Sequence, residues 1–304
     1  MEPTKKKYLI QKYLIKQNIR GTIILAKEGV NATIAGKYVD IKFIINKINK
    51  TLDIKNFDSE NISKCKFQPF HRGKVKIKKE IVPMNLSLSP KTKNKNKYIE
   101  PNKWNKLIKN KDTLVLDSRK PFEYDVGTFN KSINPNVDNF REFPKYLNKL
   151  NKKKSIAMFC TGGIRCEKAS IYLKKKGFKN VYQLEGGIIE YIRQVKEENI
   201  ENNFLGKNFV FDNRRTEKIS DDIIANCHQC RKPFDVHTNC ANDACHLLFI
   251  QCEECKTKMQ NCCSYKCLEI KQIPHKLQKQ LRRGQKNSND IFKKGRTKNI
   301  TTFN

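Results

Sequence analysis

The stretch Ser155-Ile156-Ala157-Met158-Phe159-Cys160-Thr161-Gly162-Gly163-Ile164-Arg165-Cys166-Glu167-Lys168-Ala169 decides the fold of the middle of this chain. Its first five residues form a short apolar run typical of a buried strand, and a helix is expected from Glu167 to Lys176. Gly162 and Gly163 lie between these elements and allow a tight turn with positive φ. This order of strand, tight loop and helix points backbone N–H groups and the positive end of the helix into the loop.

Cys160 comes directly after the expected strand, at the start of the loop, where the backbone amides converge. Arg165 adds a fixed positive charge, and four residues separate it from the cysteine. The amides, the helix end and the arginine all stabilise a thiolate, the reactive form of cysteine, and would equally stabilise a persulfide. A cysteine that only fills a core needs no such anion-receiving loop. We therefore predict that Cys160 and Arg165 are catalytic. The active-site loop between them consists of Thr161, Gly162, Gly163 and Ile164.

Three further residues are expected close to this loop. Cys166 follows the arginine and falls in the first helical turn, so it is the competing nucleophile and a candidate resolving thiol. Asp117 ends a second expected strand, Leu114–Asp117, and Arg119 lies two residues further on. The carboxyl ends of parallel strands meet at one edge of a sheet, so we expect this pair near the same edge as the loop, as structural support first and as a substrate contact second.

The regions around the loop suggest an α/β unit that follows a smaller α+β unit. In residues 100–203, expected strands alternate with helices, which indicates a parallel sheet with ligands at its carboxyl edge. In residues 1–90, the pattern favours a helix, a hairpin, a second helix and a closing strand pair, with both helices on one sheet face. The expected elements there are a helix at 8–19, strands at 21–26 and 32–36, a helix at 38–50, and strands at Cys65–Phe67 and Val75–Ile81. A hydrophilic linker, 89–97, separates the two units.

Residues 204–270 are rich in cysteine: nine of the chain's 12 cysteines lie between Cys227 and Cys267. Two C-x-x-C pairs in this region are a strong zinc signal, because a tight turn places both sulfurs on one ion. Reduced, unliganded thiols are the alternative, but so small a region needs a staple to fold. The first predicted structural zinc site is Cys227, Cys230, Cys252 and Cys255. The second, in a cross-braced order, is Cys240, Cys245, Cys263 (or Cys262) and Cys267. For the region as a whole, His228, His237 and His246 are alternative ligands.

The chain is strongly basic, with 63 Lys and Arg against 30 Asp and Glu and a net charge of +33. Such a field attracts nucleic acid, although the joint excess of Lys, Asn and Ile is also typical of AT-rich coding. A nucleic-acid face is suggested by Phe67–Arg72 with Lys74, Lys76, Lys78 and Lys79, and an edge strand with solvent-facing lysines is the alternative.

The tail, 271–304, is expected to be flexible unless a partner orders it. Its candidate phosphate contacts are Arg282, Arg283 and Arg296. With neither a membrane span nor a signal peptide, we expect a soluble, cytoplasmic protein.

The stretch Phe159–Ala169 resembles the signature of the rhodanese-type tRNA uridine hydroxylases. The resemblance extends over nearly the whole chain, through Leu25–Asn31, Asp117–Arg119, Gly127–Phe129, Leu184–Ile188, Phe209–Asp212, Cys227–Cys230 and His246–Cys252. It implies a ferredoxin-like α+β domain (1–90), an α/β rhodanese domain (100–203), a cysteine-rich, zinc-binding region (204–270) and a basic tail (271–304). Family members usually begin with a strand before the first helix, so we expect either a first sheet that lacks a strand or a translation start upstream.

The activity implied by the resemblance is oxygen-dependent 5-hydroxylation of the wobble (position 34) uridine of tRNA. Molecular oxygen would be the co-substrate, Cys160 the site of a persulfide-type intermediate, and the anticodon region of tRNA the partner. No haem, flavin or non-haem iron motif is visible. The loop chemistry supports equally a sulfurtransferase that works through a Cys160 persulfide. A phosphatase needs a loop one residue longer, and a non-enzymatic zinc- and RNA-binding module would not need the intact Cys160 and Arg165.

Overall fold

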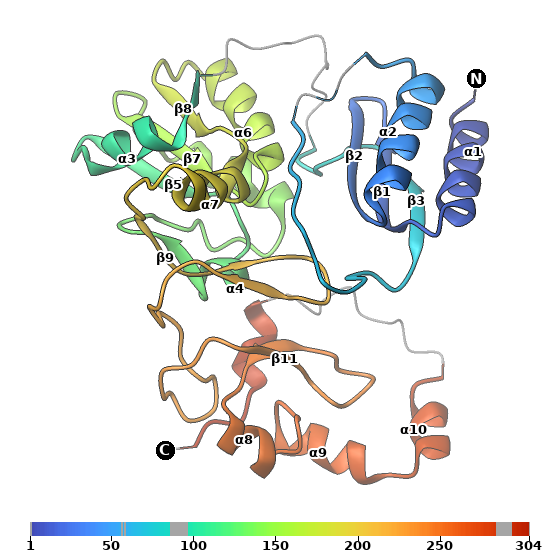
Figure 1. Ribbon diagram of the computed structural model, residues 1–304. Helices are drawn as coiled ribbons and strands as arrows, with labels where there is room; N and C mark the ends of the chain where they lie inside the picture. Colours follow the sequence, from blue (N-terminus) through green and yellow to red (C-terminus); the bar gives the residue numbers. More distant parts are fainter. Residues whose placement is uncertain (1, 56, 58, 86–96, 284–293, 304) are drawn as a thin grey trace. The chain divides into compact units, whose positions relative to one another are not determined.

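The computed structural model describes residues 2–55, 57, 59–85, 97–283 and 294–303 (Figure 1). Most of the expected linker, 89–96, and residues 284–293 of the expected tail lie outside the described residues. The chain divides into two compact units. The first comprises Met1–Leu114, Phe140–Ile200 and Val210–Arg214, and the second Val115–Asn139, Glu201–Phe209 and Arg215–Asn304. These two units do not test the expected division of the sequence into four regions, which therefore stays a prediction.

The first unit begins with a small sheet covered by two helices (Figure 1). Its elements are α1 (Pro3–Lys16), β1 (Arg20–Ala26), β2 (Gly29–Ala35), α2 (Tyr38–Leu52) and β3 (Gly73–Ile77). The strand order is β2-β1-β3, with β1 antiparallel to β2 and parallel to β3. Burial alternates along β1, and its inward side chains share one core with both helices. That core contains Ile10, Leu14, Ile23, Leu25, Ile44, Ile48 and Val75. The expected α+β arrangement, with helices on one sheet face, is confirmed.

The strand expected at Cys65–Phe67 is wrong, because residues 60–72 form no strand. Cys65 is exposed and Phe67 is 52% exposed, so this segment has no face to bury against a sheet. A few hydrogen bonds fix it instead: Gln68 Nε2 donates to Ala35 O at 3.2 Å, and Asn213 N donates to Pro69 O at 3.0 Å. The strand expected near Val75 is present as β3, which pairs with β1 alone.

The α/β part has the expected order of strands and helices (Figure 1). Its sheet has the order β4-β8-β7-β5, and β8 is parallel to both of its neighbours. Residues Ile156–Phe159 of β7 are all buried, as expected of a central parallel strand. The elements are β4 (Lys97–Ile99), α3 (Pro101–Lys109), β5 (Thr113–Asp117), η1 (Phe140–Glu142), α5 (Phe143–Leu147), β7 (Ser155–Phe159), α6 (Ile164–Lys175), β8 (Val181–Leu184) and α7 (Gly187–Glu197).

The second unit joins a short sheet to the cysteine-rich region. The sheet has the order β10-β9-β6, and β11 and β12 form a separate antiparallel pair. One apolar cluster, with Phe122, Phe209 and Leu248 among its members, spans both parts. The elements are α4 (Pro121–Tyr124), β6 (Gly127–Phe129), β9 (Phe204–Phe209), β10 (Thr216–Lys218), β11 (His237–Asn239), β12 (Leu248–Ile250), α8 (Glu253–Lys258), α9 (Tyr265–Gln272), α10 (His275–Leu281) and η2 (Lys294–Asn299).

The expectation of a flexible tail is wrong for its last described residues. Ile300 is buried in the cluster that contains Cys240, Cys263 and Phe249. Thr301 N donates to Cys263 O at 3.0 Å, and Phe303 N donates to Gln229 O at 2.7 Å. The expectation of flexibility rested on the excess of basic residues in the tail, and this excess does not reveal the few apolar and backbone contacts that order its end. Among the described residues, no helix is both long and apolar enough to cross a membrane.

Candidate active site

Cys160 stands where the sequence places it, between β7 and α6, and it has no exposed surface. Gly163 has φ +88°, so the chain turns sharply there and α6 begins at Ile164. Gly163 N donates to Cys160 Sγ at 3.1 Å. The helix therefore starts three residues before the expected Glu167, and both Arg165 and Cys166 lie in its first turn.

The surroundings of the Cys160 sulfur favour its ionised form. Burial alone would raise the pKa of the thiol. A hydrogen bond from the Cys166 side chain, the charge of Arg165, and the backbone N–H groups of both residues outweigh burial and lower the pKa to about 5. Cys160 is therefore a thiolate at neutral pH, which is the form that reacts. The sequence correctly indicated the amides and the arginine, but it gave no indication that the neighbouring cysteine donates to the sulfur.

The start of α7 supports the loop from behind. Ile188 N donates to Cys160 O at 3.0 Å, and Ile189 N donates to Thr161 O at 3.1 Å. These bonds occupy the loop's carbonyl groups and leave its N–H groups to the sulfur. Gly187 allows this approach: its φ is +67°, and a Cβ there would lie 2.6 Å from Cys160 O. In the sequence, Gly187 was noted only as part of the stretch Leu184–Ile188 that carries the family resemblance.

Lys168 was missed as a site residue, although its position two residues after Cys166 could have drawn attention to it. Its side chain is 6% exposed and donates to Glu28 Oε2 at 3.0 Å, to Val82 O at 2.7 Å and to Glu80. Glu28 in turn accepts from Ile81 N. Burial raises the pKa of the Glu80 carboxyl, but hydrogen bonds and the charge of Lys168 lower it below the usual value overall. This Lys168 node ties α6 to residues 28 and 80–82 of the first sheet region.

Asp117 and Arg119 form a fully buried ion pair, with Arg119 Nη2 at 2.6 Å from Asp117 Oδ2. Arg119 also donates to Gly127 O, and Thr128 Oγ1 donates to Asp117 Oδ2 at 3.1 Å. Such a pair fixes the backbone after β5. That it supports the Cys160 loop stays a prediction. Within the loop, Arg165 Nη2 donates to Thr161 Oγ1 at 3.3 Å, which holds the Arg165 guanidinium against the loop.

The structure brings together the sulfurs of both expected zinc sets in the cross-braced order. Within each set, all four sulfur atoms lie within 4.8 Å of one another. Tetrahedral zinc–thiolate bonds of about 2.3 Å would place the sulfurs about 3.8 Å apart. The Cys230–Cys252 and Cys245–Cys263 sulfur pairs lie 3.5 Å and 3.7 Å apart, so the spacing fits the ion. The sets are Cys227, Cys230, Cys252 and Cys255, and Cys240, Cys245, Cys263 and Cys267.

Backbone N–H groups donate to sulfurs in both sets, as expected around metal-bound thiolates. Cys252 N donates to Cys227 Sγ at 3.3 Å, and Cys263 N donates to Cys240 Sγ at 3.5 Å. Cys262, the alternative ligand, is outside both sets. His228 and His237 also lie outside them, and burial lowers the pKa of His237 to about 3, which keeps it neutral.

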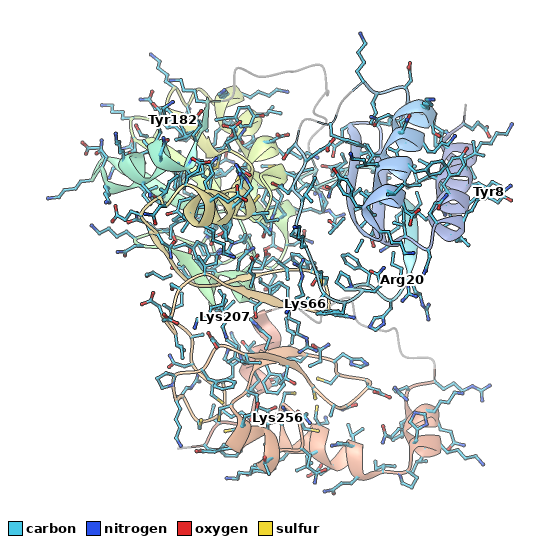
Figure 2. The ribbon with its side chains drawn as sticks, viewed as in Figure 1. Tyr8, Arg20, Lys66, Tyr182, Lys207 and Lys256 are labelled. Atoms are coloured by element: carbon cyan, nitrogen blue, oxygen red, sulfur yellow. The ribbon has the colours of Figure 1, made fainter. Side chains whose placement is uncertain are left out.

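Most of the residues that were expected to contact RNA are exposed, but one of them is engaged in an ion pair. Basic side chains occur in every part of the chain, as Arg20, Lys66, Lys207 and Lys256 illustrate (Figure 2). Arg282 is engaged, because its Nη1 lies 3.3 Å from Asp243 Oδ2. The side chain of Arg296 lies outside the described residues. The following expected contacts are exposed: Phe67, His71, Arg72, Lys74, Lys76, Lys78, Lys79 and Arg283.

Three family models match the chain. They are described as UPF0176 acylphosphatase like domain, over residues 1–81, Rhodanese-like domain, over residues 100–194, and Rhodanase C-terminal, over residues 205–268. Among solved structures, a rhodanese-related protein from Thermoplasma volcanium is 31% identical, and the match covers 32% of this chain and 92% of that one with a TM-score of 0.29.

Two curated relatives match over most of their length. The tRNA uridine(34) hydroxylase of Pelagibacter ubique (strain HTCC1062) is 67% identical over 231 residues, which are 75% of this chain and 76% of the relative. The tRNA uridine(34) hydroxylase of Yersinia pestis (strain Pestoides F) is 43% identical over 291 residues, which are 93% of this chain and 81% of the relative. The chain therefore belongs to the tRNA uridine(34) hydroxylase family.

Proposed function

We propose that this chain hydroxylates C5 of the wobble uridine, position 34, of tRNA, with Cys160 as the reacting residue. Its relatives' names support the reaction, and the state of the Cys160 sulfur is the observation that carries the mechanism. The sulfur is buried, accepts from Gly163 N and has its pKa lowered to about 5, so it is ionised at neutral pH. A nucleophilic or persulfide-bearing sulfur needs such an environment.

Each part of the loop contributes differently to the stabilisation of that sulfur. Arg165 offsets its negative charge and that of an anionic intermediate, and the N–H groups at the start of α6 do the same. Gly187 and α7 hold the loop's carbonyl groups away from the sulfur. Molecular oxygen is the co-substrate in this proposal, because replacing C5–H by C5–OH requires an oxidant.

Transfer of sulfane sulfur through a Cys160 persulfide is the second candidate function. The same N–H groups that stabilise the thiolate would hold a persulfide anion, so the loop geometry favours this activity too. The two candidates differ in product: one leaves an oxygen on the nucleoside, and the other leaves a sulfur. A phosphatase stays disfavoured by the four-residue spacing, and a purely zinc- and RNA-binding module by the ionised cysteine.

In this proposal both cysteine sets hold structural zinc. Each set supplies four sulfurs, the full complement of a tetrahedral zinc ion, which is typical of closed, structural sites. The ions would cross-link a region whose apolar clusters are small and built partly from these cysteines. We also propose that the anticodon region of tRNA is the partner and that the protein acts in the cytoplasm, where tRNA is modified.

Mass spectrometry of tRNA nucleosides tests the proposed reaction. Cells that express this chain as their only family member should contain 5-hydroxyuridine or nucleosides derived from it, and cells without the chain should not. A thiolated uridine that appears in its place would identify the sulfurtransferase. Unchanged nucleosides, with the protein present and folded, would refute both activities.

A further inference from the structure

The segment Ile300–Phe303 contacts both cysteine sets of the second unit. Ile300 is only 8% exposed, and it is buried in the cluster that contains three sulfurs of the second set, those of Cys240, Cys263 and Cys267. Phe303 packs against another cluster, which contains three sulfurs of the first set, those of Cys227, Cys252 and Cys255. One short stretch of chain therefore supplies an apolar side chain to the surroundings of each set.

Hydrogen bonds fix this segment to both sets. Thr301 N donates to Cys263 O at 3.0 Å, and Thr301 Oγ1 accepts from Tyr265 N at 3.2 Å. Phe303 N donates at 2.7 Å to the carbonyl of Gln229, a residue within the first C-x-x-C pair. The backbone of the segment is therefore bonded to a ligand residue of the second set and to the ligand loop of the first.

The Phe303 ring is held by two helices. The Lys258 ammonium, at the end of α8, lies 3.8 Å from the ring centroid. Tyr265, at the start of α9, packs against the ring in a T-shaped arrangement, with 6.4 Å between the centroids. Helix α8 contains Cys255 of the first set, and α9 contains Cys267 of the second. The ring therefore contacts a helix that carries a ligand of each set.

Two buried glutamines connect the sets independently of this segment. Gln251 Nε2 donates to Gln229 Oε1 at 2.8 Å, and Gln229 Nε2 donates to Cys262 O at 3.3 Å. Gln229 and Gln251 each adjoin a ligand of the first set, and Cys262 adjoins Cys263 of the second. Because these bonds hold the two sets together, changes of single side chains in Ile300–Phe303 should leave the region assembled.

We propose that the segment Ile300–Phe303 closes both cysteine sets against solvent and thereby slows the exit of their metal. The inference rests on the zinc sites of the proposed function and gives a role to residues that are not ligands. A thiolate site loses its ion when water, protons or a competing ligand reach the sulfurs, and the apolar shell of a site controls that access. In this arrangement Phe303 covers the first set and Ile300 the second.

The test is a short pulse of iodoacetamide on the purified full-length protein, followed by mass spectrometry that resolves each cysteine. Phe303→Ala should speed alkylation of the first set by roughly 5- to 30-fold, because losing an aromatic contact shifts a local opening equilibrium by about this factor. Ile300→Ala should do the same for the second set. Leu277→Ala changes a leucine of α10 that is 46% exposed, so it is the matched control and should react as wild type does.

Two milder variants cover the case in which an alanine variant does not fold. Phe303→Leu keeps an apolar side chain but loses the ring that Lys258 and Tyr265 contact, so it should raise alkylation of the first set by less than Phe303→Ala. Ile300→Val removes one methyl group and should have a correspondingly small effect on the second set.

Transfer of zinc to the chromophoric chelator pyridylazoresorcinol is the companion measurement. Each alanine variant should release one equivalent of zinc faster than wild type and the other equivalent at the wild-type rate. If zinc is present and both variants release it as slowly as wild type, the segment does not retain the metal and the inference is wrong.

Alkylation rates that stay at the wild-type value in the Phe303 and Ile300 variants would overturn the inference. The same would follow if Leu277→Ala raised them as much. If wild type contains no zinc, the proposed zinc sites fall, and retention of the metal falls with them. Alkylation of the free thiols then still shows whether the segment covers the two sets, so the two failures are distinguishable.

Discussion

Cys160 combines full burial with a lowered thiol pKa, two properties that normally oppose each other. Burial penalises an ion, so the thiolate exists only because donors surround it. The donors come from three consecutive features of the loop: the Gly163 turn, the Arg165 charge and the Cys166 side chain. Removing any one of them should therefore move the pKa upward.

The first prediction is that Cys160 titrates near pH 5. Ultraviolet absorbance of the thiolate, measured as the difference between wild type and Cys160→Ser across pH, isolates this sulfur from those of the two cysteine sets. Because the pKa is depressed in the folded state, the stability contributed by the ionised sulfur is complete only above the unfolded thiol's pKa. It is lost as pH falls toward about 5.

Arg165→Met should raise the midpoint of that titration, because the positive charge is removed. Cys166→Ser should change it little, because serine keeps a donor, whereas Cys166→Ala should raise it. A wild-type midpoint at the ordinary thiol value of about 8.5 would contradict the description of the loop.

At the scale of the elements, the loop depends on α7 as much as on α6. Gly187 and Gly177 both have positive φ, but only Gly187 lies against other backbone: a Cβ there would meet Cys160 O at 2.6 Å, whereas nothing lies within 4 Å of one at Gly177. Gly187→Ala and Gly177→Ala are therefore a matched pair that separates backbone strain from loss of the close approach.

The second prediction is that Gly187→Ala displaces the loop and Gly177→Ala does not. Gly177→Ala should cost only the strain of a left-handed alanine, about 1 kcal/mol. Gly187→Ala should cost clearly more and raise the Cys160 pKa. Urea unfolding followed by fluorescence of Trp104, the chain's single tryptophan and fully buried, gives the stabilities. Equal losses for the two variants would argue against a role of α7 in shaping the loop.

The third prediction concerns the Lys168 node. Lys168→Met leaves the Glu28 and Glu80 carboxylates without their cation and should destabilise the chain by about 3 kcal/mol, as breaking other buried ion pairs does. Lys175→Met, on the exposed side of the same helix, should change stability by less than about 0.5 kcal/mol. Adding Glu28→Gln and Glu80→Gln to Lys168→Met should recover part of the loss. Similar effects of the two lysine changes in urea unfolding would refute the node.

Local patterns predicted most of the individual elements. The apolar run before Cys160, the double glycine and the alternation in β1 each depend on neighbours in sequence, and the structure contains the elements they indicated. Contacts between residues that lie far apart in the sequence could not be predicted from these local patterns. The Lys168 node joins residues more than eighty positions apart, and the missing strand at Cys65–Phe67 depended on whether a partner strand lay beside it. At the loop, the sequence identified Cys160 and Arg165 but not Gly187, whose importance lies in the backbone that it approaches.

At the scale of the whole molecule, the two cysteine sets would be the main cross-links of the second unit once they hold the proposed zinc ions. The pairs interleave along the chain, so each ion would connect segments that lie 18 or more residues apart. The C-terminal residues Ile300 to Phe303 pack on the same clusters, which makes the end of the chain part of this region. Loss of the metal should therefore loosen a large part of the unit.

The fourth prediction is that the purified chain contains two equivalents of zinc by elemental analysis, one for each set. Cys255→Ser and Cys267→Ser should each remove about one equivalent, because each changes a ligand of one set. Cys262→Ser is the matched control: Cys262 is a neighbouring cysteine outside both sets, so its zinc content should stay the same. A folded protein that contains no metal would contradict both sites.

The central claim is that Cys160 carries out the chemistry, and the most direct measurement is 5-hydroxyuridine in tRNA from cells that express matched levels of wild type, Cys160→Ser or Cys166→Ser. Serine keeps the size of the side chain but is not ionised at neutral pH, so Cys160→Ser should lose the modification while it remains folded and binds tRNA. Cys166→Ser should keep substantial activity. Full modification in cells that express Cys160→Ser, or its loss only with Cys166→Ser, would contradict this account.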